Sequence, residues 1–143
     1  PYKHTLNDGL NLQLTTYRRG SIDAGDPVYY RQIPVGSVIG YKLGANANEV
    51  IVFINIRPYY APLVRNNSMF WNVSGIRMDA SLVGGFKIDT ESVEAILDGG
   101  IAFATPENKD MGDSASEGMS FVLHDTHKPD WLAWSPKIPL GSE

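Results

Sequence analysis

Short strand-like segments recur along this chain, and in several of them apolar and polar residues alternate. Alternation with a period of two places every second side chain on the same face of a β-strand. In "LNLQLTTY", three leucines alternate with polar residues. Gly, Pro, Asn and Asp residues, which favour turns, separate the segments. They cover residues 10–17, 27–31, 35–43, 49–56, 68–73 and 100–105, with a further candidate at 119–123. The pattern predicts a mostly β fold, either a small barrel or a sandwich.

One segment, residues 49–56, is apolar on both faces and is therefore expected to be a central strand. The segment at 35–43 contains Gly36 and Gly40, which suit bends or β-bulges. From these positions we expect four side chains to be buried in the core: Val52, Ile54, Phe70 and Phe103.

The stretch "SGIRMDASLVGGFKID", residues 74–89, alternates over a length that exceeds a usual strand. Sixteen extended residues would reach roughly 50 Å, so the segment must fold back or project from the body. Gly84 and Gly85 can supply a turn or a hinge. Either a long hairpin covers the core, or its tip projects and exposes an apolar patch of the kind that marks a partner or ligand surface. The patch would comprise Ile76, Met78, Leu82 and Val83.

Helical signals are few. The sequence "TESVEAILDGG" predicts a short helix within residues 90–98, with acidic residues near its start and two glycines at its end. A helix of about nine residues is marginal alone and is expected to pack on the sheet. Residues 62–67 suit a single further helical turn.

Composition and motifs exclude several classes of function. A formal net charge of −4, with scattered Lys and Arg, argues against binding of nucleic acid. The chain has no cysteine, which excludes disulfides, thiolate zinc sites and a cysteine nucleophile. His124 and His127 lack an apparent third ligand, so no metal site is predicted. No nucleotide-binding or nucleophile-elbow motif occurs, and we expect neither an enzyme nor a cofactor.

Targeting signals are also absent from the sequence. The longest apolar run, residues 50–54, is much shorter than the roughly 20 residues that a bilayer span needs. Because the first residue is Pro1, we expect an excised or processed piece, with any membrane anchor elsewhere. We predict three parts: an N-terminal linker at 1–8, a barrel domain at 9–106, and residues 107–143 as a loop, a possible extra strand and a linker toward a following domain.

Three ordered blocks of sequence resemble the MCE domain, and most closely the multi-domain paraquat-inducible protein B group of Gram-negative bacteria. The blocks are "GSIDAGDPVYYRQIPVGSVIGYKL", "NSMFWNVSGI" and "LDGGIAFATP". The resemblance covers residues 9–106. Gln32 is a departure, because the family pattern has a small residue there, often glycine.

The resemblance implies a small antiparallel β-barrel that assembles as a six-membered ring. In family members a loop between two late strands points to the ring axis and lines a hydrophobic pore. Carried onto this chain, that loop is residues 74–86, with Ile76, Met78, Leu82 and Val83 as pore-lining candidates and Gly84 and Gly85 as hinge candidates. The family moves phospholipid between inner and outer membranes across the periplasm, with neighbouring MCE domains and an inner-membrane partner.

Three hypotheses therefore remain open. The chain is a lipid-conducting ring module, a structural spacer or docking module in a stacked tube without lipid contact, or an unrecognised enzyme. Phospholipid that co-purifies with the protein would separate the first from the second. The third would need a convergent polar site, which the sequence does not show.

Overall fold

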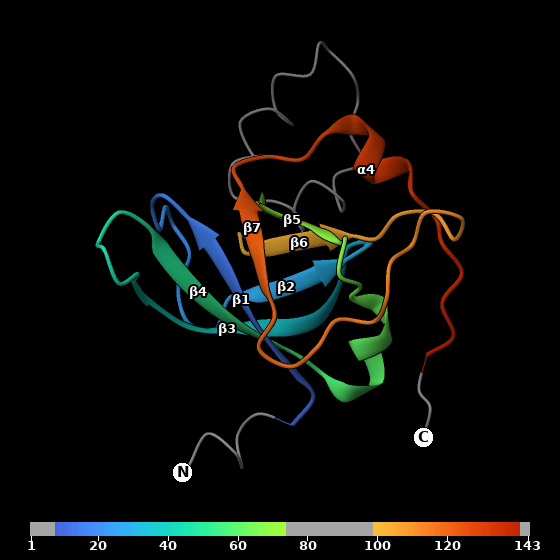
Figure 1. The fold of residues 1–143 in the computed structure, drawn as a ribbon, viewed down its shortest axis with the longest axis horizontal. Helices are drawn as coiled ribbons and strands as arrows, with labels where there is room; N and C mark the ends of the chain where they lie inside the picture. The colour runs from blue at the N-terminus through green and yellow to red at the C-terminus, as the bar shows by residue number, and fades with distance from the viewer. Residues whose placement is uncertain (1–7, 74–98, 141–143) are drawn as a thin grey trace.

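A computed structural model of the chain describes residues 8–73 and 99–140. Seven strands in these ranges form a closed barrel (Figure 1). They are β1 (Leu10–Thr16), β2 (Pro27–Tyr30), β3 (Ile33–Leu43), β4 (Val50–Ile56), β5 (Met69–Asn72), β6 (Ile101–Ala104) and β7 (Ser120–His124). The predictions of a mostly β fold and of a barrel are confirmed.

The strands follow the order β1-β4-β3-β2-β6-β5-β7 around the barrel, and β7 pairs with β1 to close it. Four contacts are antiparallel, namely β1–β4, β3–β4, β2–β3 and β5–β6. The contacts β1–β7, β2–β6 and β5–β7 are parallel. The antiparallel pairing expected from the family resemblance therefore describes four contacts, and the barrel as a whole is mixed.

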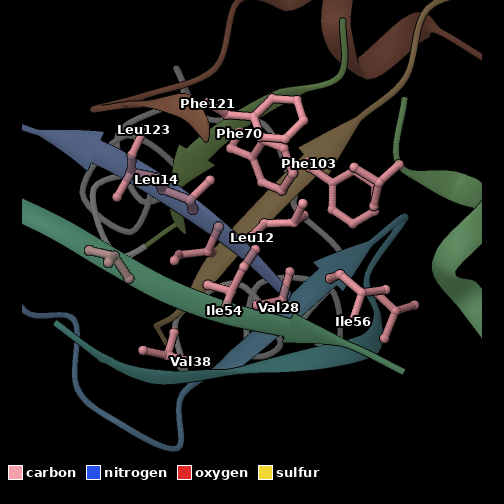
Figure 2. Packing of buried hydrophobic residues seen from close by; sticks show 14 of the residues in the cluster. Leu12, Leu14, Val28, Val38, Ile54, Ile56, Phe70, Phe103, Phe121 and Leu123 are labelled. Carbon is pink, nitrogen blue, oxygen red and sulfur yellow. The ribbon is translucent and has the colours of Figure 1, made fainter. Parts of the chain in front are cut away.

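The inside of the barrel is filled by apolar side chains that the alternating strands direct inward (Figure 2). Leucines of β1 meet β-branched residues of β4 and aromatic rings of β5, β6 and β7. Phe70 lies between Phe103 and Phe121, with ring centroids 5.0 and 4.8 Å away. The four predicted core residues are confirmed, with exposed fractions of 0% for Val52, Ile54 and Phe70 and 2% for Phe103.

The two glycines of β3 differ in their surroundings: Gly40 lies at an irregularity of the predicted kind, and Gly36 lies where two backbones approach closely. The register between β3 and β4 shifts between Val38 and Gly40, which is a bulge or irregularity of the ladder. At Gly36 the backbones approach so closely that a Cβ atom would collide with the carbonyl oxygen of Asn55.

A two-residue turn, Arg31 and Gln32, joins β2 to β3. Both residues have positive φ, 52° and 71°, as a type I′ hairpin turn requires. The family's preference for a small residue at position 32 has the same cause, because glycine adopts this conformation without a steric penalty. Gln32 adopts it all the same, so the departure from the family pattern leaves the turn intact.

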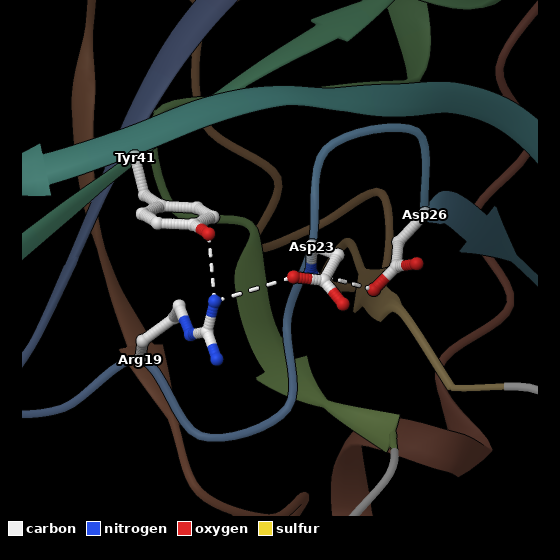
Figure 3. Close-up of polar contacts among 4 residues, drawn as sticks. All are labelled: Arg19, Asp23, Asp26 and Tyr41. Carbon is white, nitrogen blue, oxygen red and sulfur yellow. Dashed lines mark hydrogen bonds and ion pairs between the residues drawn. The ribbon is translucent and has the colours of Figure 1, made fainter.

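The loop between β1 and β2 is held against β3 by polar contacts (Figure 3). The Arg19 guanidinium lies 3.2 Å from Asp23 and donates a 2.6 Å hydrogen bond to Tyr41. The backbone N–H of Asp23 donates to the Asp26 carboxylate at 2.9 Å. Buried Ile22 anchors the same loop in the core. These exposed polar contacts position a loop and contribute little stability individually.

The segment after residue 106 belongs partly to the barrel. The extra strand considered at 119–123 is β7, which lies between β5 and β1. A helix, α4 (Pro129–Ala133), follows it and buries Trp131, while Ile138 and Leu140 pack against the core. A barrel that ended at 106 would lack its closing strand.

The predicted helix at 90–98 lies outside the described residues. The single turn expected at 62–67 is found slightly earlier, as the 3₁₀ helix η1 (Pro58–Leu63).

Candidate functional site

The residues that the sequence put forward for function lie outside the described part of the chain. These are Ile76, Met78, Leu82, Val83, Gly84 and Gly85. The structure does describe where their segment is attached. The backbone N–H of Val73 donates to the carbonyl of Gly100 at 3.0 Å, directly beyond the antiparallel pair β5–β6. Both points of attachment therefore lie together at one end of this strand pair.

A second candidate site, missed by the sequence analysis, lies on the outside of β2, β6 and β5. Adjacent residues of a strand point to opposite faces. In β5, Phe70 fills the core, so Trp71 faces outward, and in β2 Val28 and Tyr29 divide in the same way. Strand β6 places Phe103 inside and the small Ala102 outside. The outer face of these three strands is therefore aromatic, with a short side chain in its middle.

Helix α4 covers this outer face (Figure 1). Pro129 occupies its first turn, where the missing N–H costs nothing. Trp131 packs against Trp71, with ring centroids 5.6 Å apart, and against Trp134 at 6.4 Å. We call this group the outer cluster. Its buried members are Tyr29, Trp71, Val73, Ala104 and Trp131.

The outer cluster does not fill its space and leaves a cavity of about 220 Å³. Drug-sized ligands occupy pockets of roughly 300–1,000 Å³, so this one suits a single ring or a short chain. Apolar and aromatic side chains dominate the lining, and the hairpin turn contributes Arg31 and Gln32. The lining residues are Tyr29, Tyr30, Arg31, Gln32, Trp71, Val73, Ala102, Phe103, Ala104, His127, Trp131, Leu132 and Trp134.

Polar groups at the cavity are few. The Arg31 guanidinium reaches the Trp134 carbonyl and the Ser135 hydroxyl, at 3.5 and 3.4 Å, across the end of α4. Burial raises the pKa of the Tyr30 phenol, an effect that Arg31 opposes and Glu107 reinforces. The Glu107 carboxylate accepts a 3.0 Å hydrogen bond from the Ser135 backbone N–H. The Trp71 indole N–H is buried without a hydrogen-bond acceptor among the described residues.

His127 lines this cavity, and His124 packs against Trp131 next to it. The His127 ring is 5.7 Å from that of Trp71, and the His124 ring is 5.0 Å from that of Trp131. Burial lowers the pKa of His124, and Lys128 lowers it further, while Asp125 opposes the shift. Within residues 8–73 and 99–140, no three His, Asp or Glu side chains come together as metal ligands would.

A buried polar group elsewhere is structural. The hydroxyls of Ser68 and Thr105 lie 2.7 Å apart, and Thr105 donates to the Leu63 carbonyl at 2.6 Å. The Ser68 hydroxyl also accepts from the Arg65 backbone N–H at 2.9 Å. Each hydroxyl is thus engaged in joining η1 to the ends of β5 and β6.

The sequence analysis missed the cavity because the segments that form it, strands β2, β5 and β6 and helix α4, are distant from one another in the sequence. The stretch "HKPDWLAWSPKIPLGSE", residues 127–143, contains three prolines and is therefore predicted from the sequence to be a linker. The available signals were Trp131 and Trp134 at a spacing of three, after a proline that can start a helix. Nothing in that segment indicates that its partner surface is the outer face of β5 and β6.

Comparison with known proteins gives a consistent result. The sequence model of the MlaD protein matches residues 8–99. The chain is 37% identical over 132 residues to the lipophilic envelope-spanning tunnel protein B of Escherichia coli (strain K12). It is 31% identical over 134 residues to a probable intermembrane transport protein of Haemophilus influenzae. These alignments cover 92% and 94% of this chain but only 15% of each relative. No helix in the described ranges has the length and apolar character to cross a membrane.

Proposed function

Because the chain belongs to the MlaD protein family, as its match over residues 8–99 shows, we propose that it is a lipid-transport module of the periplasm. The match confirms the resemblance to the MCE domain seen in the sequence. The observation that carries the proposal is this match together with two relatives named for envelope-spanning and intermembrane transport. In the proposal, six copies form a ring around an apolar pore through which phospholipid passes between inner and outer membranes.

The filled barrel supports a route between copies. Leucine, isoleucine and phenylalanine side chains occupy the interior, and many of them have no exposed surface. A barrel packed to this extent has no lumen for an acyl chain. A lipid must therefore pass outside the individual barrel, and a pore at the centre of a ring is one such path.

In the proposal, residues 74–86 line that pore through Ile76, Met78, Leu82 and Val83, with Gly84 and Gly85 as the hinge. The support is the attachment of their segment at one end of the β5–β6 pair, where Val73 meets Gly100. A pore loop that leaves and rejoins the barrel at one place can project without opening the sheet.

Apolar lining is sufficient for this function. Exposing a lipid tail to water costs about 0.8 kcal/mol per CH₂, so a sixteen-carbon chain costs roughly 12 kcal/mol. A continuous apolar path removes most of that cost and needs no catalytic residue. Methionine at position 78 adds an adaptable surface for chains of different shape.

The proposal also includes the surroundings of the ring. Its partners are neighbouring MCE domains, which extend the pore, and an inner-membrane partner. A segment outside this sequence anchors the protein to the inner membrane. Support comes from the length of the two relatives, of which this chain spans 15%. The alternative is a spacer in a stacked tube whose pore touches no lipid.

The double variant Leu82→Asp/Val83→Asp in the full protein tests the pore assignment. Twelve carboxylates around a narrow axis would repel one another and remove apolar contact, so lipid crosslinking to the pore should be lost. Thermal melting of the 143-residue chain should change little, because the seven described strands close the barrel among themselves. A collapsed melting temperature would show that the segment is part of the core. Unchanged melting together with unchanged lipid crosslinking would favour the spacer.

A further inference from the structure

We propose that the cavity of the outer cluster binds a small amphiphilic anion, with its apolar body among the aromatic rings and its carboxylate or phosphate group on Arg31. Described residues carry this inference, and it does not rest on the proposed pore. The cavity lies on the outer face of β2, β5 and β6, whereas the pore candidates lie in residues 74–86.

The ligand is expected to have an apolar body because aromatic and apolar side chains form the walls of the cavity. The rings of Trp71, Trp131 and Trp134 pack one after another beside the cavity, tilted by 35° and 36° to one another. Ala102 leaves space that a larger side chain would fill. Water in such a space finds few hydrogen-bond partners, so an apolar group displaces it favourably. A volume of about 220 Å³ admits one ring or a short alkyl segment.

The ligand is expected to be negatively charged because of the charged side chains that line the cavity. Among the described residues that line the cavity, Arg31 is the only Arg or Lys, and none is Asp or Glu. Within the described residues, the Arg31 guanidinium forms no ion pair, and its hydrogen bonds go to two neutral oxygens at 3.4 and 3.5 Å. A carboxylate or phosphate would give shorter, charge-assisted bonds. The nearby carboxylate of Glu107 already accepts from the Ser135 N–H.

The turn that carries Arg31 is strained in a way that suits a binding site. Two consecutive residues other than glycine, Arg31 and Gln32, have positive φ. Such conformations cost free energy and often occur at ligand sites. The buried indole N–H of Trp71 is a further donor at the wall that lacks an acceptor among the described residues. An acceptor atom of a ligand would satisfy it.

Intrinsic fluorescence can detect this ligand without a label. The chain contains three tryptophans, and all three line the cavity. Titration of the 143-residue chain with decanoate, below its micelle-forming concentration, should give a saturable change in emission. Decanol, which has the same chain length without a charge, should bind about tenfold more weakly, which corresponds to one charge-assisted hydrogen bond.

Three variants locate the site. Arg31→Gln should weaken decanoate binding about tenfold and change decanol binding less than about twofold. Lys42→Gln removes an exposed cation on β3 and should leave the affinity for both probes unchanged. Ala102→Leu should fill the cavity and abolish the response to both probes, while circular dichroism shows that the fold is kept.

The outcomes are distinct. Absence of a saturable change, equal affinity for decanoate and decanol, or equal weakening by Lys42→Gln and Arg31→Gln would overturn the proposal. A concentration-dependent fluorescence change that accompanies self-association, without a response to decanoate, would show that the cavity receives a second copy and would also overturn it. Decyl phosphate distinguishes the head group, since tighter binding than decanoate would indicate a lipid phosphate and weaker binding a fatty acid. Loss of lipid crosslinking at position 82 would leave these results unaffected, so the two proposals fail separately.

Discussion

The inside and the outside of strands β2, β5 and β6 are both apolar but differ in how completely they are packed. The inner face joins a core to which all seven strands contribute, and Phe70, Leu14 and Ile54 in that core have no exposed surface. Among the described residues, the outer face packs against α4, a helix of five residues, and retains a cavity of about 220 Å³. Strands with two apolar faces thus serve two purposes here. The inner face specifies the barrel, and the outer face provides a surface with space for a ligand.

The close packing of the inner face can be tested by a substitution at Val52. Val52→Asp places an unpaired carboxylate where the side chain has no exposed surface. The cost is several kcal/mol, comparable to the whole stability of a small domain, so the chain should unfold. Circular dichroism at 25 °C provides the measurement. Val122→Asp is the matched control, because Val122 is 57% exposed on β7 and its replacement should leave the fold intact. A folded Val52→Asp protein would contradict the assigned core.

The outer cluster should respond more mildly. Trp131→Ala removes the central ring of the cluster, which is 6% exposed, and should lower the free energy of unfolding by about 3 kcal/mol. The barrel should remain folded, since Trp131 belongs to α4 and not to the inner core. Urea denaturation followed by circular dichroism measures the change. Trp134→Ala, at a partly buried position, should lower the free energy of unfolding by less than half as much. Equal decreases for the two variants would contradict the different burial of the two rings.

The hairpin turn at the rim of the cavity should gain stability on substitution. Gln32→Gly removes the steric cost of positive φ and should raise the free energy of unfolding by about 0.5–1 kcal/mol. The same substitution at Gln13, within β1, should lower it, because glycine weakens the interior of a strand. Thermal melting of the two variants provides the comparison. A lower melting temperature for Gln32→Gly would indicate that contacts of the Gln32 side chain outweigh the strain.

The smallest expected effect concerns pH and His124, at the edge of the outer cluster. Since burial lowers the pKa of this imidazole, the folded chain binds a proton less readily than the unfolded chain does. The neutral imidazole of His124 therefore makes its full contribution to stability above the ordinary pKa of about 6.5, and this contribution is lost as the pH falls below that value. His124→Gln should flatten the decrease in melting temperature between pH 7.5 and 5. The shift should be small because His124 is only partly buried, and a steeper decrease in the variant would contradict the stated sign.

Much of the barrel could be predicted from the sequence because each strand carries its own local pattern. Alternation located β1, an apolar run located β4, and the core positions Val52 and Phe70 were predicted correctly. The parallel contacts of β7 could not be predicted in this way. They depend on which distant strands become neighbours, and alternation within one strand does not contain that information.

The outer cluster could not be predicted for a related reason. The outward position of Trp71 follows from alternation with Phe70, but a strand pattern does not say what covers its outer face. The covering helix α4 is too short to produce a clear periodic signal. The prolines in and around it favour a linker when only the sequence is considered. The pore candidates at residues 74–86 came from the family resemblance and remain predictions.

In the proposed function, lipid meets the chain at residues 74–86 and does not pass through the filled barrel. A photo-crosslinking amino acid at Leu82 in the full protein, within its native membranes, tests this proposal. We expect light-dependent phospholipid adducts at position 82 and none at position 42, on the outer side of β3. Adducts of equal yield at both positions, or none at position 82 while the assembled protein is intact, would contradict it.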